Sequence, residues 1–298
     1  MSIKFDVIVI GSGPGGEGAA MKAIKEGKKV AICDSSFSIG GSCTHKGTIP
    51  SKALRHASQI ISDTESLKDS NYQSILKSTE KIITQQYNLR KSFYERNRVE
   101  ILDGRAHFID EHSIHVINDS GTKKKYSADY FVIATGSRPY HPEDIDFTHP
   151  RILDSDSILS INDNPRTISI YGAGVVGCEY ASIFRGLMIK VNLINTRSQL
   201  LTFLDDEIID ALAYHLRENG VLIRHNEEYE KVVPDDEGVT VYFKSNKKIR
   251  SEYLLWAQGR TGNSDSMGLE NIGIKGNIRG SIEVNENFQT KIHPHIYA

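Results

Sequence analysis

The sequence has few cysteines and no long hydrophobic run. Both features narrow the class of protein to which it can belong. Three cysteines lie scattered among 298 residues, which is too few for a disulfide framework or a paired metal motif. No apolar stretch approaches the roughly 20 residues that span a bilayer. The first residues already resemble a strand and leave no room for a leader peptide. We therefore expect a soluble, unprocessed protein of the reducing cytoplasm, without a metal site.

An excess of charge of one sign is also missing. The 36 basic and 38 acidic residues leave a formal net charge of -2. This balance gives no reason to expect nucleic acid or a membrane as a partner. With 39% hydrophobic residues, the chain is long enough for about two domains, each with its own core. Small molecules are the expected ligands.

Residues 5–34 have the pattern of a dinucleotide-binding unit. An apolar strand runs into a glycine-rich turn, then a helix, then a second apolar strand. Gly11 permits the tight turn, Gly13 lets the backbone approach a pyrophosphate, and Gly16 allows helix and strand to pack closely. Asp34 ends the second strand, where a carboxylate would accept from ribose hydroxyls. The alternative is a glycine turn with a surface aspartate, but it does not explain why the strand, the three glycines, the helix and the acid all occur at the expected spacing.

A second unit of the same kind covers residues 167–194. Its turn has the three glycines Gly172, Gly174 and Gly177 between a strand and a helix. A protein that binds two dinucleotides is usually transferring hydride between them. Two such units therefore indicate an oxidoreductase more specifically than one does.

The residues after the second unit bear on the choice between NAD(H) and NADP(H). Asn195 stands where a ribose-binding acid would be, followed by Thr196 and Arg197. A carboxylate beside a 2′-phosphate would cost about 4 kcal/mol per charge pair at an effective dielectric near 20. Asn195 removes that repulsion and can still bond a ribose hydroxyl, and Arg197 could pair with the phosphate. The alternative is a turn with a solvent-facing arginine.

Apolar spacing predicts the other elements. Helical periodicity indicates helices over 51–63, 72–97 and 206–219, and part of the second helix could instead face another subunit. Alternating or continuous apolar runs predict strands at 99–102, 106–109, 113–117, 123–127, 130–134, 221–225, 229–233, 238–243 and 248–255.

A loop with one cysteine joins the first unit to the helix at 51–63. Residues 40–52 read Gly-Gly-Ser-Cys-Thr-His-Lys-Gly-Thr-Ile-Pro-Ser-Lys. This run is very similar to the loop of the FAD-dependent disulfide reductases that lies along the isoalloxazine ring. That family has a second cysteine five residues after the first, whereas here Cys43 is followed by Thr48, which closes dithiol exchange. The wording resembles one branch of the family, the soluble pyridine nucleotide transhydrogenases, which keep the flavin and lack the disulfide.

The resemblance extends along the chain. The runs at 134–139 and 257–263 are similar to the places where the family's chain enters and leaves its nicotinamide domain. The implied fold is α/β, with two Rossmann-like domains for FAD and NAD(P), one inserted in the other. The implied boundaries are an FAD domain at 1–149, an NAD(P) domain at 150–264 and a return to the FAD domain at 265–298. The family's C-terminal interface domain is not in this sequence, so we expect a truncated chain that holds FAD poorly.

The resemblance implies FAD-dependent hydride transfer between NADPH and NAD⁺, in a homodimer or higher oligomer. Lys52 would approach flavin N5 and Glu179 would pair with it across the domain boundary. Cys43 is expected to pack near the ring rather than act in redox chemistry. Val175, where some relatives have a tyrosine, would leave nicotinamide access open. A diaphorase or dihydrolipoamide-dehydrogenase-like flavoprotein without active disulfide, and a non-catalytic nucleotide-binding fragment, remain alternatives.

The predicted site residues follow these motifs. The catalytic candidates are Lys52, Glu179 and Cys43. The candidates for contact with FAD, NAD(H) or NADP(H) are Gly11, Gly13, Pro14, Gly15, Gly16, Asp34, Ser35, Gly40, Gly41, Ser42, Cys43, Lys52, Ala106, Thr135, Gly136, Gly172, Gly174, Val175, Gly177, Glu179, Asn195, Thr196, Arg197 and Gly259.

Overall fold

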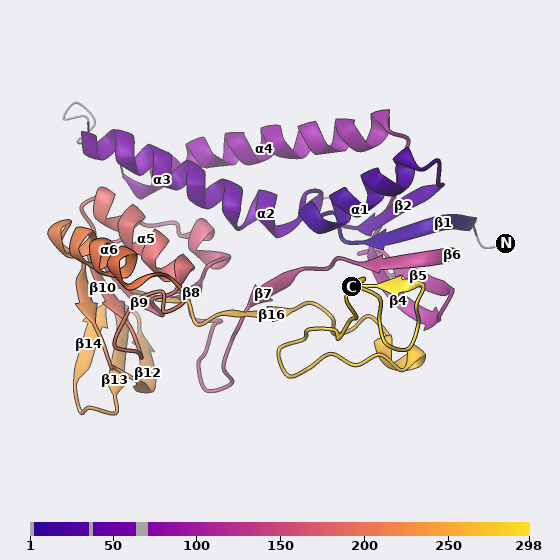
Figure 1. Cartoon of the computed structure of the whole chain (residues 1–298). Helices are drawn as coiled ribbons and strands as arrows, with labels where there is room; N and C mark the ends of the chain where they lie inside the picture. The colour runs from indigo at the N-terminus through magenta and orange to yellow at the C-terminus, as the bar shows by residue number, and fades with distance from the viewer. Residues whose placement is uncertain (1–2, 36–37, 64–70) are drawn as a thin grey trace. The chain divides into compact units, whose positions relative to one another are not determined.

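The computed structural model describes residues 3–35, 38–63 and 71–298 (Figure 1). It divides into two compact units that alternate along the chain. The first unit has residues 1–48, 83–138 and 260–298, and the second has residues 49–82 and 139–259. Among the helices of the described ranges, none has both the length and the apolar character that crossing a membrane needs.

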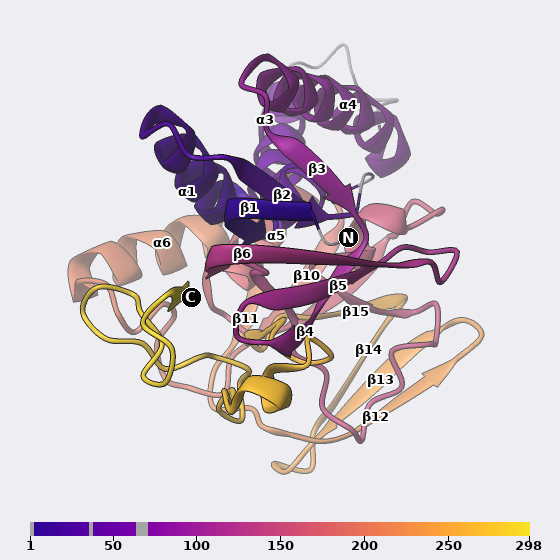
Figure 2. The same ribbon diagram turned by 90° about the vertical axis from the view of Figure 1, so that its right-hand side faces the viewer.

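The first unit is built on a seven-stranded sheet. Its strands run in the order β3 (Glu100–Asp103), β2 (Val30–Asp34), β1 (Ile3–Ile10), β6 (Lys123–Ile133), β5 (Ser113–Ile117) and β4 (Arg105–Asp110), with β17 (Ile296–Tyr297) also paired to β6. Strands β3, β2, β1, β6 and β17 are parallel, whereas β5 and β4 are antiparallel (Figure 2). The central strands are apolar on both faces, as a covered parallel sheet requires.

Helices complete the first unit. Helix α1 (Pro14–Lys25) contacts β1 and β2, and α2 (Gly41–His45) is a short turn after β2. Helix α4 (Tyr72–Arg96) belongs to this unit from residue 83 onward. Its Tyr94 is buried with Val9 and Ile32, and its hydroxyl donates to the carbonyl of Ser12 at 3.3 Å. This contact braces the first glycine turn.

The second unit has a five-stranded parallel sheet. The order is β11 (Leu222–Arg224), β10 (Lys190–Ile194), β9 (Thr167–Tyr171), β15 (Tyr253–Trp256) and β8 (Ile152–Asp154). A separate antiparallel sheet contains β12 (Tyr229–Asp235), β13 (Gly238–Phe243) and β14 (Lys248–Ser251). The helices are α3 (Thr48–Asp63), α5 (Val175–Gly186) and α6 (Asp206–Glu218), with 3₁₀ turns at Ser157–Ser160 and, in the first unit, Leu269–Ile272. Strands β7 (Ser137–Pro139) and β16 (Arg260–Gly262) pair where the chain passes between units.

Two strand predictions were wrong in detail. The strands expected at 123–127 and 130–134 are one strand, β6, because the alternation of buried residues continues through Ala128. Asp129 lies within β6 and pairs with Lys4 at 2.7 Å. The strand expected at 248–255 is two strands, because β14 pairs with β13 in the antiparallel sheet whereas β15 pairs with β8 and β9 in the parallel sheet.

Helix α3 packs into the core of the second unit. Leu54 is fully buried in a cluster with Phe184 and Tyr72. The Tyr72 ring lies 5.3 Å from that of Phe184, and its hydroxyl donates to the carbonyl of Ile158 at 2.8 Å. This packing explains why residues 49–82 fall in the second compact unit.

Candidate functional site

Two glycines hold the first turn against neighbouring backbone. Gly11 has φ +105°, and a Cβ there would lie 2.3 Å from the carbonyl oxygen of Ala134. A Cβ on Gly16 would lie 1.9 Å from the oxygen of Gly11. Added Cβ atoms on Gly13 and Gly15 would meet no atom of the described chain within 4 Å. The turn is therefore tight on its inner side and open above the N-terminus of α1, as a phosphate site requires.

Asp34 braces this turn. Its Oδ2 accepts from the Oγ and N–H of Ser12 at 2.5 and 2.8 Å, and its Oδ1 accepts from the N–H of Ser35 at 2.8 Å. A carboxylate has about four acceptor positions. Donors of the described residues use three of these positions, so Asp34 has a structural role that is compatible with the predicted contact to a ribose hydroxyl.

The loop with Cys43 is anchored to the same turn. The N–H of Gly40 donates to Ser12 Oγ at 3.0 Å, and a Cβ on Gly41 would lie 2.9 Å from the Cα of Gly13. Ser42 and Cys43 lie in α2, a helix that the sequence did not predict. The glycine turn and the cysteine loop are thus packed against each other and joined by a hydrogen bond.

The cysteines of the chain are free thiols in this structure. Burial raises the pKa of Cys33 to about 12 and that of Cys178 to about 11, so neither is a thiolate near neutral pH. Cys43 is partly exposed. Within the described ranges, no three His, Cys, Asp or Glu residues are grouped so that they could hold a metal ion.

The second glycine turn repeats the geometry of the first. Gly172 has φ +117°, and its Cβ would lie 2.4 Å from the oxygen of Ala257. A Cβ on Gly177 would lie 1.8 Å from the oxygen of Gly172, whereas one on Gly174 meets no described atom within 4 Å. Val175 begins α5 and is 57% exposed. Each unit therefore has an open helix N-terminus suited to a pyrophosphate.

Lys52 and Glu179 form the predicted ion pair. Their Nζ and Oε1 atoms lie 2.6 Å apart, and the side chains are 62% and 18% exposed. The pair was expected to cross a domain boundary, but both residues belong to the second compact unit because Leu54 packs α3 into its core. Exposed pairs contribute only about 0–1 kcal/mol, so the pair orients the ammonium group more than it stabilises the fold.

Asn195 organises its own loop. Its side chain is 6% exposed; Oδ1 accepts from the N–H of Arg197 at 3.2 Å, and Nδ2 donates to the carbonyl of Gln199 at 2.7 Å. Thr196 and Arg197 are exposed, and Arg197 donates to Thr202 Oγ1 at 2.7 Å. The contact predicted between Asn195 and a ribose would compete with these bonds, so Thr196 and Arg197 are the more accessible candidates.

The remaining candidates are Thr135, Gly136 and Ala106 in the first unit and Gly259 in the second. Asn263 donates from Nδ2 to the carbonyl of Thr135, and from N–H to that of Gly136, each at 3.0 Å. Thr135 and Gly136 line a cavity of about 320 Å³ at the end of β6. Ala106 is buried in β4, so only its backbone could contact a cofactor. In the second unit, Gly259 has φ +95° and accepts from the N–H of Tyr140.

Glu227 was not predicted from the sequence. Its carboxylate is nearly buried beside the 195–199 loop, because its N–H donates to the carbonyl of Asn195 at 3.1 Å. Lys247 and Ser245 donate to its two oxygens, each at 2.6 Å. The Lys247 ammonium, followed by the Ser245 hydroxyl, holds the pKa of Glu227 below its usual value. No local pattern links residues 20 positions apart that meet through a strand meander.

The lowered pKa of Glu227 makes the free energy of unfolding depend on pH in the acid range. Because the folded-state pKa is lower, the stabilisation is complete above the unfolded-state value of about 4.3 and is lost as the pH falls through the folded-state value. Glu227→Gln should lower Tm near neutral pH and make Tm fall less steeply below about pH 4.3. Calorimetry of both proteins between about pH 3 and 7 tests this. Parallel Tm curves would contradict it.

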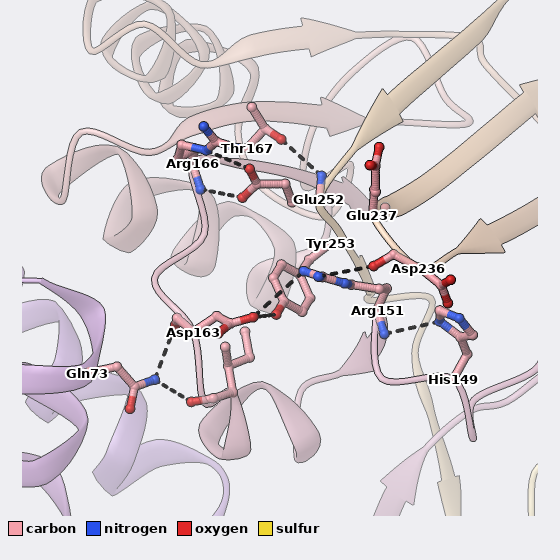
Figure 3. Close-up of polar contacts among 12 residues, drawn as sticks. Gln73, His149, Arg151, Asp163, Arg166, Thr167, Asp236, Glu237, Glu252 and Tyr253 are labelled. Carbon is pink, nitrogen blue, oxygen red and sulfur yellow. Dashed lines mark hydrogen bonds and ion pairs between the residues drawn. The ribbon is translucent and has the colours of Figure 1, made fainter.

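A larger cavity of about 720 Å³ lies at the opposite ends of the second unit's strands. Figure 3 shows polar contacts of residues that line it, among them Arg151, Arg166 and Glu252. Two of the arginines that line it contact their neighbours: Arg166 Nε donates to the carboxylate of Glu252 at 2.7 Å, and Arg151 donates to the backbone carbonyl of Asp236 at 3.2 Å. Thr167, at the start of β9, also lines it. The cavity therefore lies at the amino ends of the sheet, away from the glycine turns, which follow the carboxyl ends of their strands.

Comparison with known proteins agrees with this geometry. Residues 5–298 match the family described as pyridine nucleotide-disulphide oxidoreductase. The chain belongs to this family. Over its whole length it is 56% identical to the soluble pyridine nucleotide transhydrogenases of Salmonella typhimurium and Salmonella typhi, and it spans 66% of their length.

Two solved structures share the fold. The HOCl-induced flavoprotein disulfide reductase RclA from Escherichia coli, as its Cu(II) complex, has a TM-score of 0.88 at 28% identity, over 99% of this chain and 65% of RclA. LpdA from Mycobacterium tuberculosis has a TM-score of 0.90 at 22% identity, over 98% of this chain and 67% of LpdA, and shows the fold alone. The predicted α/β fold is confirmed, whereas the domain boundaries at 149/150 and 264/265 stay predictions.

Proposed function

We propose that this oxidoreductase transfers hydride between NADPH and NAD⁺ by way of FAD. One observation carries the proposal: two glycine turns of the same geometry occur in one chain, one followed by an acid, Asp34, and the other by Asn195 and Arg197. A turn with an acid suits a plain ribose, and a turn without one accepts a 2′-phosphate. The 56% identity to soluble pyridine nucleotide transhydrogenases supports the same activity.

The first unit fits FAD. Open backbone above α1 would face the pyrophosphate, and the Asp34 carboxylate would accept from the ribose. The cysteine loop is fixed to this turn through Gly40 and Gly41, so it would lie along the cofactor. FAD would supply a ring that accepts hydride from one nicotinamide and yields it to another.

The chain's own residues would bind the cofactor and orient the nicotinamide beside it. Glu179 holds the Lys52 ammonium, which would favour negative charge on the cofactor. Val175 is a small exposed residue at the start of α5 and would leave room for a nicotinamide. Thr48 has a hydroxyl that cannot form a disulfide, so Cys43 has no redox partner at that position. The proposal includes a cytoplasmic location and a homodimer or higher oligomer.

The test uses a preparation that contains FAD. NADPH should reduce a thionicotinamide analogue of NAD⁺, and alkylation of thiols after reduction should leave most of that activity, because no dithiol takes part. The measurement is the absorbance of the reduced analogue before and after alkylation. Near-complete, reduction-dependent inactivation would sink the proposal. Rapid quinone reduction without transfer to the analogue would identify a diaphorase instead.

A further inference from the structure

His225 lies between two hydrogen-bond donors. It follows β11, directly beside the loop that follows β10, because the N–H of Asn195 donates to the carbonyl of Arg224 at 2.8 Å. The Nδ1 atom of His225 is 3.2 Å from Nδ2 of Asn195. Its Nε2 atom is 3.3 Å from Nη2 of Arg217, in the last turn of α6. A neutral imidazole has only one acceptor nitrogen, so it cannot accept from both neighbours.

The orientation of Asn195 determines which nitrogen of His225 is the acceptor. Oδ1 of Asn195 accepts from the N–H of Arg197, and Nδ2 donates to the carbonyl of Gln199. If the amide were turned over, Nδ2 would face the N–H of Arg197, donor against donor, and Oδ1 would face the carbonyl of Gln199, acceptor against acceptor. The second hydrogen of Nδ2 therefore points to His225 Nδ1, which must accept. The proton of His225 then lies on Nε2.

This tautomer makes two donors converge. The Nε2–H of His225 and the guanidinium of Arg217 face one another 3.3 Å apart, and no acceptor of the described chain is recorded for this Nε2–H. Nearby Glu227 is occupied by Lys247 and Ser245. Two donors that meet in this way suit an anion, and a phosphate oxygen accepts from both strongly.

The position indicates which phosphate would bind. The carboxyl ends of β10 and β11 form the part of a Rossmann sheet where the adenosine ribose lies. We propose that His225 and Arg217 bind the 2′-phosphate of NADP(H), in addition to the predicted Arg197. The assignment rests on the proposed function, because it takes the second glycine turn as the nucleotide site.

The experiment compares two ligands that differ only in the 2′-phosphate. Titration calorimetry of the chain should show 2′,5′-ADP binding at least about tenfold more tightly than 5′-AMP. Arg217→Gln and His225→Ala should each weaken 2′,5′-ADP about tenfold and leave 5′-AMP unchanged. Lys190→Gln is the matched control, since it removes one exposed positive charge at the other end of β10. It should leave both affinities unchanged.

Each alternative result has a separate meaning. Equal affinities for 2′,5′-ADP and 5′-AMP in the unaltered chain, or equal weakening by Arg217→Gln and Lys190→Gln, would overturn the assignment. Inorganic phosphate binding as tightly as 2′,5′-ADP would show a site for free phosphate and would also overturn it. Absence of 5′-AMP binding would instead count against the proposed function.

The tautomer has its own readout. Nitrogen-15 NMR of the ligand-free chain should show His225 protonated on Nε2 and not on Nδ1. A proton on Nδ1 would remove the convergent donor and contradict the inference. This measurement does not depend on any nucleotide.

Discussion

Gly177→Ala is expected to disrupt the second compact unit, whereas Gly174→Ala should leave it folded. The new methyl group at Gly177 would lie 1.8 Å from the carbonyl oxygen of Gly172. Both positions are backbone, so no flexible side chain can move aside. Forced overpacking costs about 1–3 kcal/mol, and occasionally more. We expect the upper end of that range, a large part of a typical domain's stability of about 5–15 kcal/mol.

The control is in the same turn. Gly174 has φ -80°, which alanine adopts readily, and its added Cβ meets no described atom within 4 Å. Gly174→Ala should therefore lose less than about 1 kcal/mol of stability. It should still weaken NADP⁺ binding, because the methyl group occupies the approach to the pyrophosphate. Urea denaturation and nucleotide titration measure the two effects, and equal stability of the two variants would refute the steric argument.

Lys52→Met should slow hydride transfer from NADPH about 100-fold in a preparation that contains FAD. This is the loss usually found when one preorganised group facing developing negative charge is removed. The fold should be nearly unchanged, since the Lys52 side chain is 62% exposed and such pairs stabilise weakly. Stopped-flow absorbance measures flavin reduction, and melting curves check the fold.

Arg55→Met is the matched control for Lys52→Met. Arg55 lies one helical turn further along α3 and carries the same charge. Its replacement should change the reduction rate less than about twofold, because charges screened by water interact weakly. A similar loss of rate in both variants would mean that net charge, and not the position of Lys52, controls the reaction.

The sequence predicted the features that depend on neighbours within about ten residues. Glycines at fixed intervals between a strand and a helix specify the turn, because Gly16 and Gly177 each exclude a Cβ from a backbone contact within the motif itself. The pairing of Lys52 with Glu179 came from resemblance to a family. It could not come from spacing, because the residues are 127 positions apart.

Features that depend on tertiary packing were not visible in the sequence. The contact of Glu227 with Lys247 and the position of His225 both require that strands remote in sequence end side by side. The predicted contact of Asn195 with a ligand stays a prediction, and the sequence did not show that its amide bonds the backbone of its own loop. A residue type shows which bonds it can form, and only the fold shows which are already made.

The close match of the two glycine turns indicates that binding of the pyrophosphate and selection between nucleotides depend on different residues. The interfering distances in the two turns, 2.3 and 1.9 Å in one and 2.4 and 1.8 Å in the other, agree to a tenth of an ångström. The two turns thus exclude a Cβ in the same way, and discrimination belongs to residues outside them: those after the second strand of each unit and, in the second unit, Arg217 and His225 as well. Transplanting residues 11–16 into positions 172–177 would then leave nucleotide preference unaltered, whereas exchanging the short segments that begin at Asp34 and Asn195 would alter it.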